Sequence, residues 1–194
     1  QANIFMDILD DPDAVKRAVA AITETLKDYA DALIATGVNA IMVDTLFASQ
    51  SIMSKGMWKE FEGVYVKDLA QHIHDQNCMV MIHNCGNGIY FDVQIEAMKP
   101  EAISFLHLPD DCKTREELKE KYGHITTLIG HVDPTWIIHA SEEEVREECR
   151  NQIDIYKKDG GFILATGCEY PANADFRNAE VMVEEAKTYG RYRK

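Results

Sequence analysis

The apolar positions of the chain follow two alternating patterns, one with the spacing of a helix and one of short continuous runs. The first helical pattern opens at Asp11-Pro12, because Asp is a favoured N-cap residue and Pro fits the first turn. We expect Gly37 to end this helix. Between these two points the apolar residues recur every three or four positions: Val15, Ala18, Val19, Ile22, Leu26, Ala30 and Leu33.

Five apolar runs of strand length predict strands: residues 38–43, 78–82, 102–106, 125–129 and 162–165. Amphipathic segments between and after them predict helices: residues 54–76, 89–99, 114–123, 141–158 and about 178–189. Thr114 with Glu117, and Ser141 with Glu144, form capping boxes at two of the starts. Continuous apolar strands that alternate with helices predict an α/β fold with a parallel sheet.

Two architectures fit five strand–helix units: a small doubly wound sheet, or part of a TIM-type (β/α)8 barrel. The chain begins in the middle of a unit, with a helix that leads into its first strand, and this favours the barrel. We therefore expect residues 1–194 to be the C-terminal part of a single barrel domain. A complete barrel takes about 250 residues or more, which predicts roughly 100–150 further residues upstream.

Polar side chains follow every predicted strand, at the end where parallel α/β sheets carry their sites. In chain order these residues are Asp44, then His83, Asn84 and Cys85, then His107, then His131 and Asp133, and finally Cys168 and Glu169. Because the carboxyl ends of parallel strands meet at one edge of a sheet, we expect these side chains to share an active-site rim.

Three of these residues predict a metal site. His83 and Cys85 are two positions apart at a strand end, so their side chains point to the same side. Cys168 leaves another strand of the same sheet, and two cysteines with one histidine are typical of a catalytic zinc site with one open position. The alternative is that all three are buried packing groups, as we interpret Cys78 and Cys149 to be, because free cysteine is among the most buried residue types.

The neighbours of these predicted ligands have competing interpretations. A carboxylate that accepts the second ring N–H of His83 would fix the tautomer of the ring. Asp133 precedes a proline, and Asp at such a position often only shapes a turn. Glu169 is adjacent to Cys168 and is a candidate for the fourth ligand position.

The composition of the chain argues against several classes of protein. The chain of 194 residues is 46% apolar and 27% charged, as in an ordinary globular domain. Its formal net charge of −13 argues against a nucleic-acid partner, since phosphates are bound by Lys and Arg. No apolar run approaches the roughly 20 residues of a membrane span, and no leader marks export. Five cysteines without disulfide spacing indicate thiols in a reducing cytoplasm, and Cys112, in a polar loop, has no assigned role.

Several stretches together resemble the uroporphyrinogen decarboxylase superfamily: GVNAIMVDTLFAS with MSKGMWKEF, then HNCGN, GHVDP and GFILATGCEYPANA. They are most similar to its cobalamin-dependent methyltransferases, typified by methylcobamide:coenzyme M methyltransferase, because H-x-C is followed far downstream by a cysteine after G-F-I-L-A-x-G. The resemblance covers essentially the whole chain, aligned with the C-terminal part of a family member. It implies a TIM-type barrel in which His83, Cys85 and Cys168 bind Zn²⁺.

The resemblance also implies a reaction and its partners. A methyl group would pass from methylcobalamin on a corrinoid protein to a small-molecule thiol such as coenzyme M, or to another methyl acceptor. Zinc in such a site can bind the substrate thiol and deprotonate it. The candidate catalytic or pocket residues are Asp44, His107, His131 and Asp133. The candidate cofactor-binding residues, which surround Cys85, are Asn84, Gly86 and Asn87.

The sequence departs from this family in two respects. The N-terminal portion is absent, including the arginine-bearing segment of the porphyrin decarboxylases, and EYPANA replaces the usual small residue and prolines. Two alternatives therefore stand beside a zinc methyltransferase. One is a superfamily enzyme that acts on a porphyrin or methylated substrate without zinc–thiol chemistry, and the other is a non-catalytic truncated barrel. Unpaired sheet edges invite association, so we also expect a homodimer.

Overall fold

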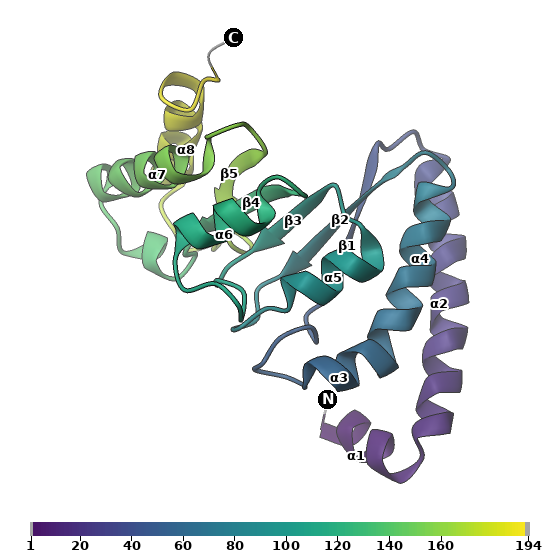
Figure 1. The fold of residues 1–194 in the computed structure, drawn as a ribbon. Helices are drawn as coiled ribbons and strands as arrows, with labels where there is room; N and C mark the ends of the chain where they lie inside the picture. Colours follow the sequence, from purple (N-terminus) through teal and green to yellow (C-terminus); the bar gives the residue numbers. More distant parts are fainter. Residues whose placement is uncertain (1, 193–194) are drawn as a thin grey trace.

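The computed structural model describes residues 2–192 and contains a single five-stranded sheet within them (Figure 1). Its strands are β1 (Ala40–Asp44), β2 (Met79–Asn84), β3 (Ala102–Phe105), β4 (Thr127–Val132) and β5 (Phe162–Thr166). Neighbouring strands pair in parallel, and their order in the sheet, β1-β2-β3-β4-β5, follows the chain. A doubly wound sheet reverses its strand order at a switch point, and this sheet has no reversal. The fold is therefore α/β and matches part of a TIM-type barrel, as predicted.

Helices precede, link and follow these strands (Figure 1). They are α1 (Ala2–Asp10), α2 (Pro12–Ile34), α3 (Lys55–Trp58), α4 (Val64–His74), α5 (Phe91–Met98), α6 (Arg115–Tyr122), α7 (Glu142–Tyr156) and α8 (Phe176–Thr188), with a π-helical turn η1 (Lys59–Gly63) and a 3-10 turn η2 (Trp136–Ile138). Within the described part of the chain, none of the helices is both long and apolar enough to cross a membrane.

The two predicted capping boxes differ in the structure. At the start of α7, Ser141 and Glu144 bond to each other's backbone N–H groups, so this box is complete. At the start of α6, the Thr114 hydroxyl accepts the N–H of Glu117, as predicted. The Glu117 carboxylate accepts the N–H of Lys113 at 2.6 Å rather than that of Thr114. The second box is therefore only half formed, although the helix still begins where the sequence indicates.

Some element boundaries differ from the sequence pattern. Strand β2 runs through Asn84 and β4 through Val132, so His83 and His131 lie inside strands rather than after them. Backbone pairing to the neighbouring strands continues through these residues regardless of side-chain polarity. The predicted helix over residues 54–76 is interrupted by η1, and α1, which lies before the first predicted cap, was not predicted.

The sheet has a helix-covered face and an open face. On β2, Val80 and Ile82 are fully buried on the covered side, whereas Met79 on the open side is 44% exposed. The covered face and the helices share the main apolar core, which includes Leu69, Ile73, Phe91, Met98, Ile103, Phe105, Leu128 and Tyr156. The open face would line the interior of a closed barrel, and it carries His83 at the end of β2.

Candidate metal centre

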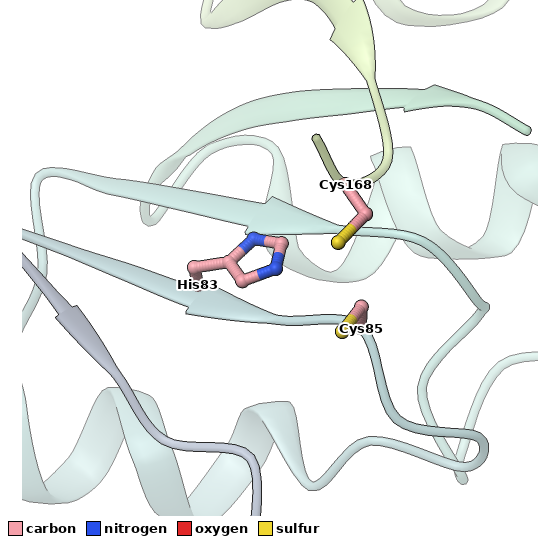
Figure 2. Close-up of side chains that lie close together, drawn as sticks. All are labelled: His83, Cys85 and Cys168. Carbon is pink, nitrogen blue, oxygen red and sulfur yellow. The ribbon is translucent and has the colours of Figure 1, made fainter. Parts of the chain in front are cut away.

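His83, Cys85 and Cys168 come together at the carboxyl ends of the strands. One ligand atom from each residue lies within 4.8 Å of the others, and all three residues are partly buried. Figure 2 shows the His83 ring and the Cys85 thiol on the same side of the end of β2, with the Cys168 thiol opposite them on the segment after β5. The structure thus brings together the three residues that the sequence predicts as metal ligands.

Cys168 reaches the end of β2 although β3 and β4 lie between β2 and β5. Three strand spacings of about 4.8 Å would separate the two strands by about 14 Å in a flat sheet. The chain after β5 closes part of this distance at Gly167, whose N–H donates to the carbonyl of Val132 at 2.8 Å. A Cβ at Gly167 would lie 2.7 Å from the Cα of Leu106, so glycine is required for the chain to cross the end of β3 closely.

The hydrogen bond at His83 orients its ring toward the two thiols. Its Nδ1 lies 3.0 Å from the hydroxyl of Ser104, a buried residue paired with His83 in register across β2 and β3. The other ring nitrogen, Nε2, faces the cysteines (Figure 2). A carboxylate at this position would fix the tautomer of the ring, but the partner in the structure is a hydroxyl. Sequence reasoning missed Ser104, although it is the single polar residue in the apolar run 102–106.

The donor set and its surroundings fit a zinc ion. Burial raises the pKa of the Cys85 thiol, and the neighbouring Cys168 raises it further, so the pair favours a compensating positive charge. Zinc–sulfur and zinc–nitrogen bonds of about 2.3 and about 2.0 Å place tetrahedral ligand atoms about 3.5–4 Å apart. Ligand atoms within 4.8 Å of one another reach that spacing by small side-chain movements. Glu169 is exposed and lies outside this cluster.

Three other predicted rim residues lie at strand ends on the surface. Asp44, His107 and Asp133 are exposed and do not belong to the cluster of ligand atoms. The Asp133 carboxylate accepts the N–H and the hydroxyl of Thr135, both at 2.7 Å, and the N–H of Trp136 at 3.3 Å. Loss of solvation beside neighbouring protein atoms works to raise the pKa of Asp133, but these hydrogen bonds outweigh it and hold the pKa below its usual value. In this structure Asp133 shapes the turn before η2.

His131 lies in the helix-covered core rather than on the rim where the sequence places it. Its Nδ1 is 3.2 Å from the carbonyl oxygen of Leu106, and its Nε2 is 3.1 Å from the hydroxyl of Tyr156. Its ring stacks on Phe105 with centroids 4.8 Å apart. Burial lowers the pKa of His131 to about 4. The ring is therefore neutral at pH 7, so Nδ1–H donates to the carbonyl and Nε2 accepts from the hydroxyl.

The candidate cofactor-binding residues surround Cys85 but differ in their orientation. Asn84 is fully buried, and its side chain bonds to the backbone. Gly86 packs against Ser49, so its backbone rather than a side chain borders the site. Asn87 is exposed, and its N–H lies 3.4 Å from the Ser51 hydroxyl. Of the two asparagine side chains, only that of Asn87 is accessible to a ligand.

The remaining cysteines are buried away from the cluster. Cys78 and Cys149 are 4% and 0% exposed, as their interpretation as packing groups expects. Cys112 is also buried, at 7% exposure, and belongs to the main apolar core, although its local sequence is polar. Burial raises the pKa of Cys112 to about 12, which keeps this thiol protonated. Among the described cysteines, only Cys85 and Cys168 belong to a group of three candidate ligand side chains.

Comparison with solved structures supports the fold. A methyltransferase from Methanosarcina mazei superposes with a TM-score of 0.79 at 19% sequence identity. The superposition covers 98% of this chain and 54% of that protein. At this level of identity the likeness shows a shared fold.

Comparison with known sequences gives the family. A uroporphyrinogen decarboxylase from Cupriavidus metallidurans is 27% identical over 189 residues, which are 93% of this chain and 49% of the relative. One from Thioalkalivibrio sulfidiphilus is 24% identical over 187 residues, 94% of this chain and 51% of the relative. The chain thus spans about half the length of these curated relatives. The Uroporphyrinogen decarboxylase (URO-D) family profile matches residues 1–189, so the protein belongs to the uroporphyrinogen decarboxylase family.

Proposed function

We propose that the protein is a zinc-dependent methyltransferase that moves a methyl group from a methylated corrinoid protein to a thiol acceptor. The observation that carries this proposal is the convergence of His83, Cys85 and Cys168 within 4.8 Å. The shared fold with a methyltransferase from Methanosarcina mazei supports it. Residues 1–194 would supply the C-terminal part of one barrel domain, since the chain spans about half the length of its relatives.

Cys85, Cys168 and His83 would each supply one ligand atom to the metal. Cys85 and Cys168 offer two thiolates, whose negative charge reduces the effective charge of a bound cation. His83 offers Nε2 while Ser104 holds Nδ1, so the ring is ready to bind without reorientation. Three protein ligands leave one position open for a substrate. A zinc ion bound there supplies the positive charge that lets an acceptor thiol ionise at neutral pH. The acceptor thiol loses its proton, and its sulfur takes the methyl group as the cobalt–carbon bond of the donor breaks, with both bonding electrons left on the corrinoid cobalt.

Two properties of the protein test this function. We expect about one zinc per chain in protein prepared without chelators, and thiol-dependent demethylation of free methylcobalamin as a substitute for the corrinoid protein. A series of small thiols that includes coenzyme M would identify the acceptor. Replacing Cys168 by Ala leaves only two ligands and should abolish both zinc binding and demethylation. It should also remove the stabilisation that zinc gives the parent, roughly 4 kcal/mol of unfolding free energy at a thousandfold excess over Kd, and with it the rise in melting temperature.

Two other cysteines provide matched controls. Cys78→Ser and Cys149→Ser change buried packing cysteines outside the cluster and should keep zinc at the parent level. Equal zinc loss in all three variants would mean that the cysteines act through packing. A Cys168→Ala protein that binds stoichiometric zinc and demethylates methylcobalamin at the parent rate would refute the ligand set and the reaction together.

A second candidate function rests on the curated relatives, which are named uroporphyrinogen decarboxylases. In that case the protein would act on a porphyrin or a methylated substrate without zinc–thiol chemistry. Protein that contains no zinc but releases carbon dioxide from uroporphyrinogen would favour this candidate. Protein with neither activity after it is combined with the half of its longer relatives that this chain does not match would favour a non-catalytic barrel fragment.

A further inference from the structure

Asn84 ties the segment that carries Cys85 to the segment that follows β1. Its side-chain Nδ2 donates to the carbonyl oxygen of Thr45 at 2.7 Å and to that of Ala48 at 3.2 Å. Its Oδ1 accepts the backbone N–H of Gly86 at 2.8 Å. Asn84 is 0% exposed, so water cannot replace these bonds. One buried amide therefore bonds to two backbone carbonyls of the segment after β1 and to one backbone N–H in the turn that carries Cys85.

Further contacts hold the turn after β2 against the same segment, the one that follows β1. The N–H of Tyr90 donates to the carbonyl of Ala48, and the N–H of Gln50 donates to that of Gly88. Gly86 approaches the segment so closely that a Cβ there would lie 2.5 Å from the Ser49 hydroxyl oxygen. These contacts fix the turn after β2 against the segment that follows β1. Asn84 makes the central contacts, and in the chain it lies between His83 and Cys85.

We propose that Asn84 is the positioning residue of the metal centre: it holds the Cys85 thiol opposite Cys168 before any metal arrives. This inference rests on the proposed zinc site. Because Asn84 points to the covered side of β2, it touches neither metal nor substrate, and it acts through the backbone of Gly86. Metal affinity depends on how well the ligands are fixed in advance, and groups that orient ligands typically change it by 10–100-fold.

The chain offers a matched control for this residue. Asn178 on α8 is 3% exposed, and its Nδ2 likewise donates to two backbone carbonyls, those of Ile137 at 3.1 Å and Ala140 at 3.0 Å. It lies in the α7–α8 region and not in the cluster of ligand atoms. Replacing either asparagine by Ala removes a buried amide that donates to two backbone carbonyls. Asn84→Ala also leaves the N–H of Gly86 without its acceptor, whereas the carbonyls of Thr45 and Ala48 keep the N–H groups of Ala48 and Tyr90. A purely structural role predicts lower stability and unchanged zinc affinity in both variants.

The decisive measurement is zinc affinity, determined by competition with a chromogenic chelator at a temperature where both variants remain folded. We expect Asn84→Ala to weaken zinc binding by about 10–100-fold. We expect Asn178→Ala to lower the melting temperature but to keep the parent affinity within twofold. Equal affinities in the two variants would overturn the inference. A parent that binds no zinc would instead refute the proposed function itself.

A second readout needs no zinc. Phenylarsine oxide, a trivalent arsenical that bridges two neighbouring thiols, should bind the metal-free parent through Cys85 and Cys168. We expect Asn84→Ala to weaken this binding by about tenfold or more relative to Asn178→Ala, since the two thiols are no longer held together. Equal arsenical binding in the two variants would overturn the inference even if the parent has no metal.

A different variant covers the case in which Asn84→Ala does not fold. Gly86→Ala places a methyl group against Ser49 and should displace the turn, with a similar loss of zinc affinity. Adding Ser49→Gly removes the side chain in its way, so the double variant should recover most of the affinity. A Gly86→Ala protein with the zinc affinity of the parent would show that the position of the turn does not control the metal site.

Discussion

The open face and the helix-covered face of the sheet carry the same kinds of side chain in different environments. His83, near the end of β2, has one ring nitrogen on a hydroxyl and the other directed at two thiols. His131, near the end of β4, has both ring nitrogens occupied by buried partners. The first can still bind a ligand, whereas the second is a packing group with two satisfied hydrogen bonds. Both follow apolar runs in the sequence, so the difference comes from the face of the sheet.

The cysteines show the same contrast. Cys85 and Cys168 are partly exposed neighbours on the open side. Cys149 is fully buried in an apolar cluster with Val145 and Val181, and burial raises its pKa to about 12. A thiol in that environment neither ionises near neutral pH nor meets another ligand. The residue type shows only that a cysteine can in principle bind a metal. Its burial and the groups beside it decide whether it is able to do so in the folded protein.

The largest expected effect separates the two histidines. His83→Ala removes one of three ligands and should lower zinc from about one per chain to near zero. His131→Ala should keep the parent zinc content but lower the free energy of unfolding by about 2–4 kcal/mol, because it leaves a cavity and two unpaired polar groups. Elemental analysis and denaturant unfolding measure the two quantities. Loss of zinc in both variants would remove the distinction between the two faces.

An effect of intermediate size concerns the pH dependence of stability. The pKa of His131 falls from about 6.5 in the unfolded chain to about 4 in the folded protein. The unfolded chain therefore binds a proton first as the pH falls, and the stability that His131 contributes is complete above pH 6.5. It is lost progressively as the pH falls toward 4, by about 3 kcal/mol in total.

His131→Phe removes this titration and provides the comparison. Its unfolding free energy should fall less than that of the parent between pH 6.5 and pH 4, measured by urea unfolding at several pH values. Glu62 titrates in the opposite sense, because burial raises its pKa to about 7 and its contribution is lost as the pH rises from 4.5 to 7. Since Glu62 is present in both proteins, its contribution cancels in the difference. Parallel curves for the two proteins would show that His131 titrates normally in the fold.

The smallest expected effect comes from the hydroxyl that orients His83. Ser104→Ala leaves Nδ1 without its partner, and we expect zinc affinity to fall by about tenfold while the three ligands remain. Thr126→Val is a suitable control, since the buried Thr126 hydroxyl donates to the carbonyl of Pro100 at 2.9 Å outside the cluster. This control should lose stability but keep its zinc affinity. An unchanged affinity in Ser104→Ala would mean that packing alone orients the ring.

Local sequence patterns determined most of the fold. Apolar spacing located the five strands and the helices between them to within a few residues, because burial of one helix stripe or one strand run leaves a period in the sequence. The two-residue spacing of His83 and Cys85 placed both on one side of β2, since side chains alternate along a strand. Other boundaries, such as the π-helical interruption of the second helix, leave no such period and were missed.

The tertiary structure alone decided which distant residues meet. Cys168 lies near Cys85 because the chain after β5 passes close to the end of β3, and this approach leaves no repeating pattern in the local sequence. Ser104 reaches His83 because of the register between β2 and β3. His131 lies on the covered face, where its Nδ1–H donates to the carbonyl of Leu106 and its Nε2 accepts from the hydroxyl of Tyr156. The sequence determined the candidates, and the contacts between strands far apart in the chain selected among them.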